Sequence, residues 1–385
     1  MSSRDREGLR CGRAALTVGA LVAALAVGPL GVIDALADPS AGGSAMILER
    51  FAGSSVEDPK FIGLGSACLT GASAGSVPPT GQSNLSNCDG FRVGPVPSQG
   101  TGGGGGGWLQ LTDASGGNMN NNGNGAGSSA ARAGGVLFNQ ALPATAGLHA
   151  RFEQAQYGGF VNGTRDAPEG TFRSWGADGI SFILTDGNFT LTETGQTGGS
   201  LGYAQSGNGP GVAGGFLGLG LDAWGNYPRA SGALGAGCAA AGQNPGLSGS
   251  STLRDSVALR GPGWQDSNGK WTQGYCLLAV NQLSSGSLRE PWDPALGNSA
   301  DPADHDLFAA KAARKVDVEI SPADPDGSAI ITVQLQFAEG GRGTRPCPRG
   351  CKTCRPRTSS ASCPRRATRA TSTWCATSRS ARSTR

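Results

Sequence analysis

Two acidic residues at alternate positions, Asp317 and Glu319, form the pair whose spacing could support acid–base chemistry. Glycosidic-bond hydrolysis with retention requires two carboxyl groups about 5–5.5 Å apart, and residues two apart on a strand point to the same face. No third acid and no aromatic residue flanks this pair. We therefore interpret Asp317 and Glu319 as part of the solvent face of a strand.

Other catalytic patterns are missing from the sequence of residues 38–340. These residues contain no Ser-His-Asp set, phosphate-binding loop or zinc-ligand spacing, and the chain has only two histidines, His149 and His305, which we expect at the surface. The run Asp301–Asp306 carries three acids but lacks the glycine and terminal glutamate of an EF-hand, so we expect a solvated loop. The sequence indicates that the protein is not an enzyme.

The composition indicates a protein rich in turns. Glycine and proline number 66 and 22 of the 385 residues, and only 15% of the residues are charged. This disfavours long helical bundles, and only Leu307–Ala313 favours a helix. Short alternating runs separated by Gly, Asn, Asp and Pro predict an all-β, antiparallel sandwich or barrel. The expected strands are Gly107–Leu111, Gly135–Phe138, Leu148–Glu153, Gly179–Leu184, Phe216–Asp222, Ser256–Arg260, Val316–Ile320 and Ile331–Phe337.

The first 37 residues are typical of a secretory signal peptide. Four arginines precede the apolar run Ala14–Ile33, and Ala35-Leu36-Ala37 supplies the small residues of a cleavage site. A membrane anchor is the alternative, since a spanning helix needs about 20 apolar residues, but Pro29 interrupts the run and favours cleavage. We expect a secreted, extracellular or cell-surface protein with no stable membrane span after cleavage.

Four cysteines lie in residues 38–340: Cys68, Cys88, Cys238 and Cys276. An even number in an exported chain predicts two disulfides. We predict the local pairs, Cys68 with Cys88 and Cys238 with Cys276, although the sequence leaves cross-pairing open.

Three glycine-rich segments occur in a specific order and spacing, although each alone is ordinary turn chemistry. They are Gly-Ala-Asp-Gly-Ile-Ser-Phe at 176–182, Gly-Gly-Ser-Leu-Gly-Tyr at 198–203 and Gly-Leu-Gly-Leu-Asp-Ala-Trp-Gly-Asn at 218–226. Over about residues 46–337 the chain resembles the L-type (legume-lectin-like, concanavalin-like) lectins in their bacterial secreted form. The resemblance implies a jelly-roll β-sandwich over residues 38–340 that binds carbohydrate without catalysis.

The resemblance also implies the residues that contact a sugar. Asp178 would follow Ala177 through a cis peptide, and its carboxylate would accept charge-assisted hydrogen bonds from sugar hydroxyls. Gly199 would donate its backbone N–H and, lacking a Cβ, let the sugar approach. Asn226 would donate its side-chain amide, and Trp175 is a candidate for stacking on the sugar ring. The expected partners are glycans or glycoconjugates, while the sugar and the oligomeric state stay open.

The family's calcium ligands are matched only in part. Asp222, the backbone carbonyl of Trp224 and Asn226 would hold calcium, which in the family supports the cis peptide through water. The family's second calcium aspartate falls near Ala230. Calcium prefers six to eight oxygen ligands, so these residues would make a weak Ca2+ site unless Asp255, Asp186 or water completed it. The sequence leaves calcium undecided.

In the family a second ion, a transition metal, is also bound, and two of its ligand residues are missing from this sequence. Gly220 stands where the family has an acid, and Ser256 where it has a histidine. We expect no transition metal here.

Each candidate residue also has a plainer interpretation. Asp178 could close an Asx turn, Asp222 and Asn226 could cap a loop, and the Trp224 side chain could pack in the core. The alternative function is therefore a structural or adhesive cell-surface module with a degenerate sugar site. A glycoside hydrolase on the same fold is the least favoured reading.

The chain changes character at about residue 341. Residues 341–385 hold twelve basic residues, no acid and five cysteines, whereas residues 38–340 hold 15 basic and 25 acidic residues. That acidic body argues against a nucleic-acid partner. The tail has three interpretations: a disordered basic segment, a zinc knuckle of non-standard spacing, or the product of a frameshift near residue 340. The frameshift fits best, because codons from Ser372 onward can encode HVVRDLEVRTLD in another frame, which is similar to the family's final strand.

Overall fold

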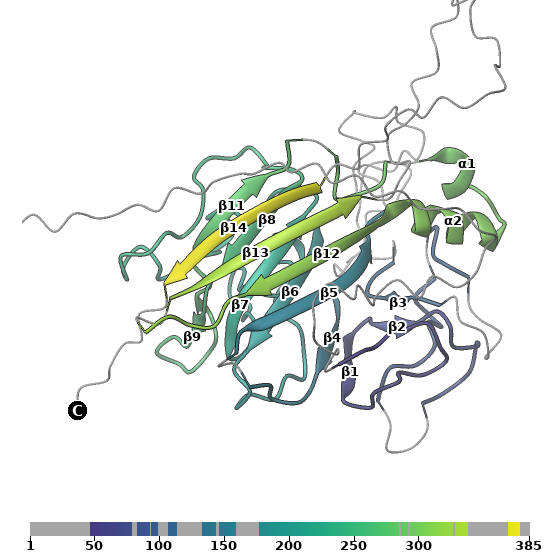
Figure 1. The fold of residues 1–385 in the computed structure, drawn as a ribbon, viewed down its shortest axis with the longest axis horizontal. Coiled ribbons are helices and arrows are strands. Elements are labelled where there is room, and N and C mark those ends of the chain that lie inside the picture. Colours follow the sequence, from purple (N-terminus) through teal and green to yellow (C-terminus); the bar gives the residue numbers. More distant parts are fainter. Residues whose placement is uncertain are drawn as a thin grey trace, which may run out of the picture.

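In a computed structural model of the chain, strands dominate and helices are few (Figure 1). The named strands pair antiparallel, as the sequence predicts, so the fold is all-β. The predicted signal segment, Trp175 and the tail cysteines before residue 369 lie outside the described part. The structure describes residues 47–78, 83–92, 94–98, 107–113, 133–143, 146–158, 177–284, 286–291, 293–325, 328–337 and 369–377.

The first four-stranded sheet has the order β11-β8-β7-β6. Its strands are β6 (Gly179–Thr185), β7 (Gly215–Asp222), β8 (Ser256–Arg260) and β11 (Leu277–Gln282). Asp222 pairs with Gly179 on one side and with Ser256 on the other. The end of β7 therefore lies between the beginnings of β6 and β8, where the glycine-rich segments enter and leave the sheet.

The second four-stranded sheet has the order β14-β13-β12-β5. Its strands are β5 (Leu148–Ala155), β12 (Ala313–Ile320), β13 (Ser328–Phe337) and β14 (Arg369–Thr377). Valines of β12 are buried and the residues between them are exposed or half-buried, as period-2 alternation requires.

The outer face of this second sheet is polar. Glu319 is exposed, and the half-buried Asp317 bonds to the exposed His149 (2.9 Å) and Arg151 (2.9 Å). The solvent-facing placement predicted for Asp317, Glu319 and His149 is confirmed.

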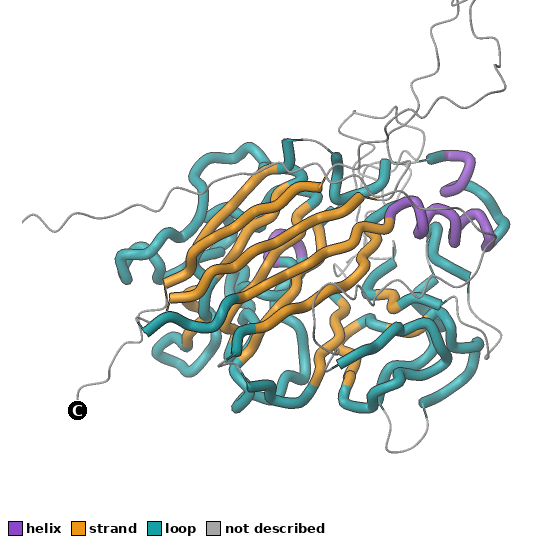
Figure 2. The backbone as a smooth tube through the Cα atoms, viewed as in Figure 1, coloured by secondary structure: helices purple, strands orange, loops and turns teal. Residues whose placement is uncertain are grey.

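The two sheets, whose strands are orange in Figure 2, lie against each other, and both contribute side chains to one apolar core. Leu219 and Leu221 of β7 meet Val316 and Val318 of β12 and their neighbours in this cluster. Burying a side chain of this size stabilises the fold by about 1.5–3 kcal/mol. The core fixes which face of β7 points inward, and so which way Asp222 points.

The other face of β7 carries glycines that lie under tyrosine rings. A Cβ on Gly218 would lie 2.2 Å from a ring carbon of Tyr203, and one on Gly220 would lie 2.3 Å from a ring carbon of Tyr227. Both tyrosines are fully buried in a second core cluster that covers this face of the first sheet. Glycine is required here because the rings occupy the space of any side chain.

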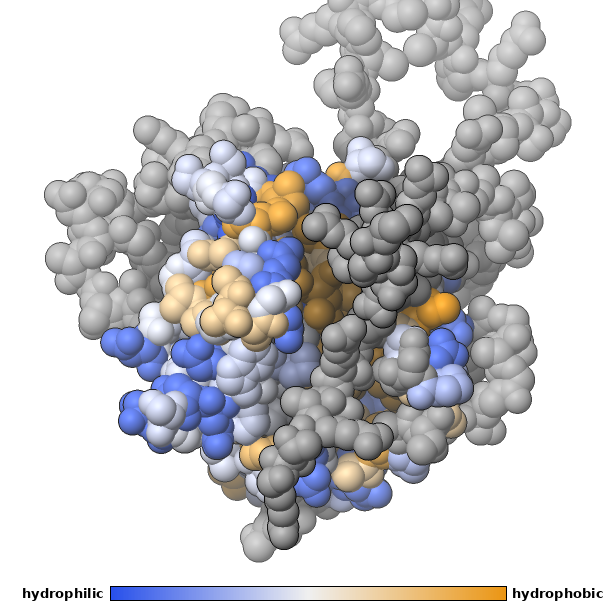
Figure 3. All heavy atoms as spheres, turned by 90° about the vertical axis from the view of Figure 1, so that its left-hand side faces the viewer, coloured by the Kyte–Doolittle hydropathy of each residue, from blue (hydrophilic) through white to orange (hydrophobic). Residues whose placement is uncertain are grey.

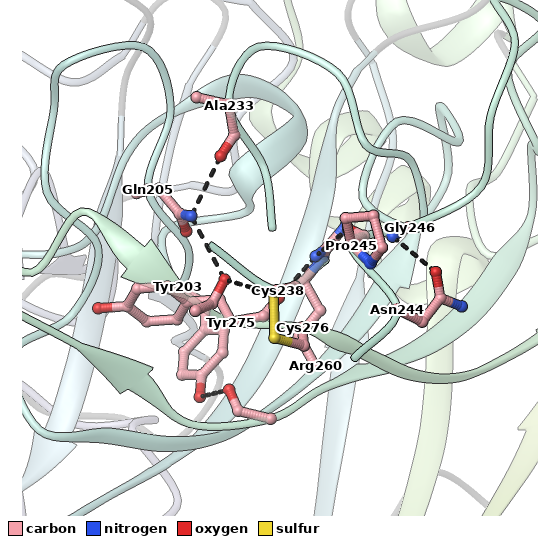
Figure 4. Close-up of a disulfide and its surroundings, with 12 residues drawn as sticks. Tyr203, Gln205, Ala233, Cys238, Asn244, Pro245, Gly246, Arg260, Tyr275 and Cys276 are labelled. Atoms are coloured by element: carbon pink, nitrogen blue, oxygen red, sulfur yellow. Dashed lines mark hydrogen bonds between the residues drawn. A yellow bond between two sulfur atoms is a disulfide. The ribbon is translucent and has the colours of Figure 1, made fainter. Parts of the chain in front are cut away.

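Both predicted disulfides are present, joining Cys68 to Cys88 and Cys238 to Cys276. The second lies beside Tyr275 and Arg260 beneath the loops that follow β7 (Figure 4).

Shorter elements surround the two sheets, and one differs from expectation. Asp301 caps α2 by accepting a hydrogen bond from the Ala303 N–H (2.9 Å), and Pro302 is its first residue. The predicted solvated loop at Asp301–Asp306 is thus wrong, because these acids begin a helix. These elements are β1 (Phe61–Gly65), β2 (Cys68–Leu69), β3 (Leu109–Gln110), β4 (Gly134–Phe138), η3 (Gly198–Ser200), β9 (Gly263–Trp264), β10 (Gln273–Gly274), α1 (Pro294–Gly297) and α2 (Pro302–Ala312).

The tail supplies one strand to the second sheet. We expected strand structure to stop at residue 341, but β14 pairs with β13 from Arg369↔Gln336 to Thr377↔Ser328. It lies at the outer edge of its sheet, drawn in yellow in Figure 1. The pairing does not test the reading frame, so the frameshift stays a prediction.

The visible surface is mixed in polarity. Hydrophilic and hydrophobic residues lie side by side on the face drawn in Figure 3. Exposed apolar side chains such as Phe216 and Leu278 are normal on a folded protein. Within the described residues, no helix has the length and apolar character needed to cross a membrane.

Candidate functional site

Three short segments meet at the end of the first sheet. Asp178 precedes β6 and is joined to Ala177 by a cis peptide, as the resemblance implies. A Cβ on Gly199 in η3 would lie 2.6 Å from the Asn226 Cβ, and one on Gly198 would lie 3.9 Å from Asp178 Oδ2. The structure therefore brings Asp178, Gly199 and Asn226 together, while Trp175 lies outside the described residues.

The side chains of Asp178 and Asn226 are both half-buried. Neither the Asp178 carboxylate nor the Asn226 amide has a hydrogen-bond partner among the described residues. Burial raises the pKa of the Asp178 carboxyl. Buried polar groups are normally satisfied by protein, water or ligand. Together the two side chains offer carboxylate acceptors beside an amide that both donates and accepts.

Backbone hydrogen bonds hold these segments in place. The Trp224 N–H donates to the Asp178 carbonyl oxygen (3.0 Å), which ties the loop after β7 to the start of β6. The Ser181 hydroxyl donates to the Leu201 carbonyl oxygen (2.7 Å), which ties the end of η3 to β6. The arrangement is therefore preorganised by the chain itself.

Asp222 is fully buried and is bound inside its own loop. Its Oδ1 accepts hydrogen bonds from the N–H groups of Trp224 (3.1 Å) and Gly225 (2.6 Å), and its Oδ2 accepts one from the Tyr227 N–H (2.6 Å). The pKa of Asp222 is raised to about 7: burial is the main cause, the three N–H groups oppose the shift, and the nearby Asp178 adds to it. This carboxylate is the anchor of the loop 222–227.

The donor set for calcium fits poorly around Asp222. Both of its oxygens face N–H groups, whose positive ends disfavour a cation at the same place. Asp255 directs its carboxylate to the Ser287 hydroxyl (2.8 Å) and the Leu288 N–H (2.9 Å). Asp186 follows β6 at the opposite end from Asp178, about 26 Å away at the rise of a strand. Asp186 is therefore too distant to complete a calcium site, and one oxygen of Asp255 is already bound.

The transition-metal position is filled by other groups. The Tyr227 ring covers Gly220, where the family has its acid, and the buried Ser256 lies opposite Asp222 on β8. No cluster of three or more His, Cys, Asp or Glu side chains suited to a metal ion occurs within the described ranges.

Two arginines support the site, and sequence reasoning missed both. The Arg254 guanidinium lies 4.8 Å from the centre of the Trp224 ring, so the half-buried Trp224 stacks on a cation. Arg260 is fully buried and donates to four backbone carbonyl groups. Its acceptors are the oxygens of Tyr227 (2.8 Å), Arg229 (2.6 Å), Tyr275 (2.6 Å) and Pro245 (3.2 Å). A lone arginine in the apolar run Ser256–Arg260 was the signal that could have found it.

Comparison with known proteins adds no assignment, because the chain matches no protein-family model, no curated protein and no solved structure.

Proposed function

We propose that the protein is a secreted, non-catalytic carbohydrate-binding protein of the L-type lectin kind. The two four-stranded sheets would then be the layers of a concanavalin-like jelly-roll sandwich. The observation that carries the proposal is the Asp178 carboxylate, half-buried and without a partner among the described residues, beside the Asn226 amide and Gly199.

The chemistry of this corner suits a sugar. A sugar hydroxyl can donate to a carboxylate and accept from an amide, and hydrogen bonds to charged groups contribute about 1.5–3 kcal/mol each. Gly199 lets Asn226 approach closely, because a Cβ at position 199 would lie 2.6 Å from the Asn226 Cβ, and the Gly199 N–H would be a further donor to the sugar. The three segments are fixed before the ligand arrives, which reduces the entropy lost on binding.

The test is a glycan-array screen of the exported chain, residues 38–385. Asp178→Ala and Asn226→Ala are expected to reduce binding by at least tenfold. Asp317→Ala is the matched control, since Asp317 is an acid on the outer face of the other sheet. Absence of binding by folded wild-type protein would contradict the proposal and favour the structural or adhesive module. Release of reducing sugar would instead indicate a hydrolase.

The adhesive module is the second candidate, and the replaced metal ligands favour it. Gly220 and Ser256 stand where the resemblance requires an acid and a histidine. In that case the same surface would tolerate Asp178→Ala without a change in any adhesion phenotype.

A further inference from the structure

The loop 222–227 that frames the proposed sugar site contains its own anchor. All three hydrogen bonds of the Asp222 carboxylate come from N–H groups within that loop. A carboxylate so placed draws the backbone around itself, which is the ordering that a bound cation would otherwise provide. Oδ1 accepts two of these bonds and Oδ2 accepts one, so about three of the four acceptor positions of the carboxylate are already taken.

The Asp178 segment is held directly as well. The Trp224 N–H donates to the Asp178 carbonyl oxygen at 3.0 Å, with no intervening ion required. Arg260 reinforces the far side of the loop through the Tyr227 and Arg229 carbonyl oxygens.

We infer that this site is metal-independent: the Asp222 carboxylate and the Trp224–Asp178 hydrogen bond replace the cation, and the sugar-contacting residues stay assembled in chelator. The inference rests on the proposed function for its ligand, but the order of the loop can be measured without any ligand.

The first measurement is the thermal unfolding midpoint, Tm, of residues 38–385 in EDTA and in calcium at about 10 mM. That concentration is about 100 times the Kd of a 10⁻⁴ M extracellular calcium site, and occupancy of such a site would raise Tm by about 3–5 °C in a chain of this size. We expect a change below about 1 °C. A calcium-dependent rise within the larger range would overturn the inference.

The second measurement is peptide-level hydrogen exchange over residues 222–227. The amides of Gly225 and Tyr227 are expected to exchange slowly in EDTA, with no added protection in calcium. Protection that appears only in calcium would overturn the inference, whether or not the protein binds a sugar.

Asp222→Asn tests the anchor itself. Its new side-chain N–H groups would face the Tyr227 N–H, so Tm should fall by about 2–4 °C, equally in EDTA and in calcium. Asp266→Asn is the matched control, because Asp266 closes an exposed loop with hydrogen bonds from Asn268, Lys270 and Thr272. A loss seen for Asp222→Asn only in calcium would indicate a metal ligand instead. If the variant does not fold, the two wild-type measurements still decide the question.

These outcomes separate the inference from the proposed function. If calcium changes neither Tm nor hydrogen exchange and the protein binds no glycan on the array, the metal-free anchor is retained and the sugar site is rejected. Glycan binding that EDTA abolishes would retain the sugar site and reject the anchor.

Discussion

The backbone N–H of Trp224 donates a hydrogen bond to the carbonyl oxygen of Asp178. This contact joins two segments that are about 45 residues apart in the chain. It holds Asp178 next to the loop 222–227, whose backbone is bound by the Asp222 carboxylate. The position of the proposed binding carboxylate thus depends on the conformation of a loop formed by a different strand. The following predictions test parts of this dependence.

Sugar binding should weaken at acid pH. Burial raises the pKa of Asp178, and sugar hydroxyls require the ionised carboxylate as acceptor. Affinity should therefore be constant at alkaline pH and fall about tenfold per unit once the pH drops below that raised pKa. Isothermal titration in EDTA across the pH range measures this. Asp178→Asn should bind weakly with a flat profile, and any remaining slope would belong to Asp222, whose pKa is about 7.

Gly199→Ala should abolish binding while leaving the fold intact. The new methyl group would lie 2.6 Å from the Asn226 Cβ and displace that residue. We expect at least a tenfold loss of affinity and, because the site is overpacked, a loss of about 1–3 kcal/mol in the free energy of unfolding. Gly135→Ala on β4 is the control, since its nearest contact would be an ordinary 3.4 Å. Equal affinity for Gly199→Ala and wild type would contradict the assignment of Gly199.

Gly220→Ala should destabilise the protein because the Tyr227 ring occupies the space of the new methyl group. Overpacking of this kind costs about 1–3 kcal/mol. Adding Tyr227→Leu should recover part of the loss, so the two changes should be non-additive in chemical denaturation. Strict additivity would show that the ring does not press on position 220.

Arg260→Met should be among the most destabilising single substitutions. It removes the donor to four buried carbonyl oxygens, and each unsatisfied group costs about 1–3 kcal/mol. We expect a loss of about 3–5 kcal/mol in the free energy of unfolding, with loss of glycan binding because Tyr227 and Arg229 flank the site. Arg151→Met, on an exposed sheet face, should cost less than about 1 kcal/mol.

Ending the chain at residue 340 should expose β13. β14 covers the edge of β13 along Ser328–Gln336, and an unpaired edge strand promotes aggregation. The truncated protein should show a lower Tm and concentration-dependent association by light scattering. Restoring the alternative reading frame after residue 340 should raise Tm above that of the printed chain. Sequencing the coding DNA across codons 335–350 tests the frameshift directly, and an intact frame would reject it.

Strand positions were predictable from the sequence where one face of the strand is buried and the other is exposed to solvent. β5, β12 and β13 alternate in the sequence and were found, and Ser256–Arg260 matches β8 in full. β11 was missed because its register shifts between Leu277 and Ala279, which breaks the period. The start of α2 was missed because it consists of acidic residues and a proline, which are equally common at the start of a helix and in a loop.

The residues of the candidate site were predictable from the sequence, but most of their hydrogen-bond partners were not. The sequence pointed to Asp178, Gly199 and Asn226, and the structure places them together. The sequence could not show that the Asp222 carboxylate accepts hydrogen bonds from backbone N–H groups, because every residue except proline has such a donor. It also could not place Arg260 beneath the loop, since that contact depends on how the loop after β7 folds over the first sheet.

The Tyr227 ring over Gly220 has an evolutionary consequence. To place an acid at position 220, a variant of this chain would first have to lose the ring, and losing the ring would also remove the hydroxyl that donates to the Gly218 carbonyl oxygen. Either substitution alone therefore gives a less stable protein. Sequence change is thereby directed to the loops around the site and away from the face of β7 that the ring covers.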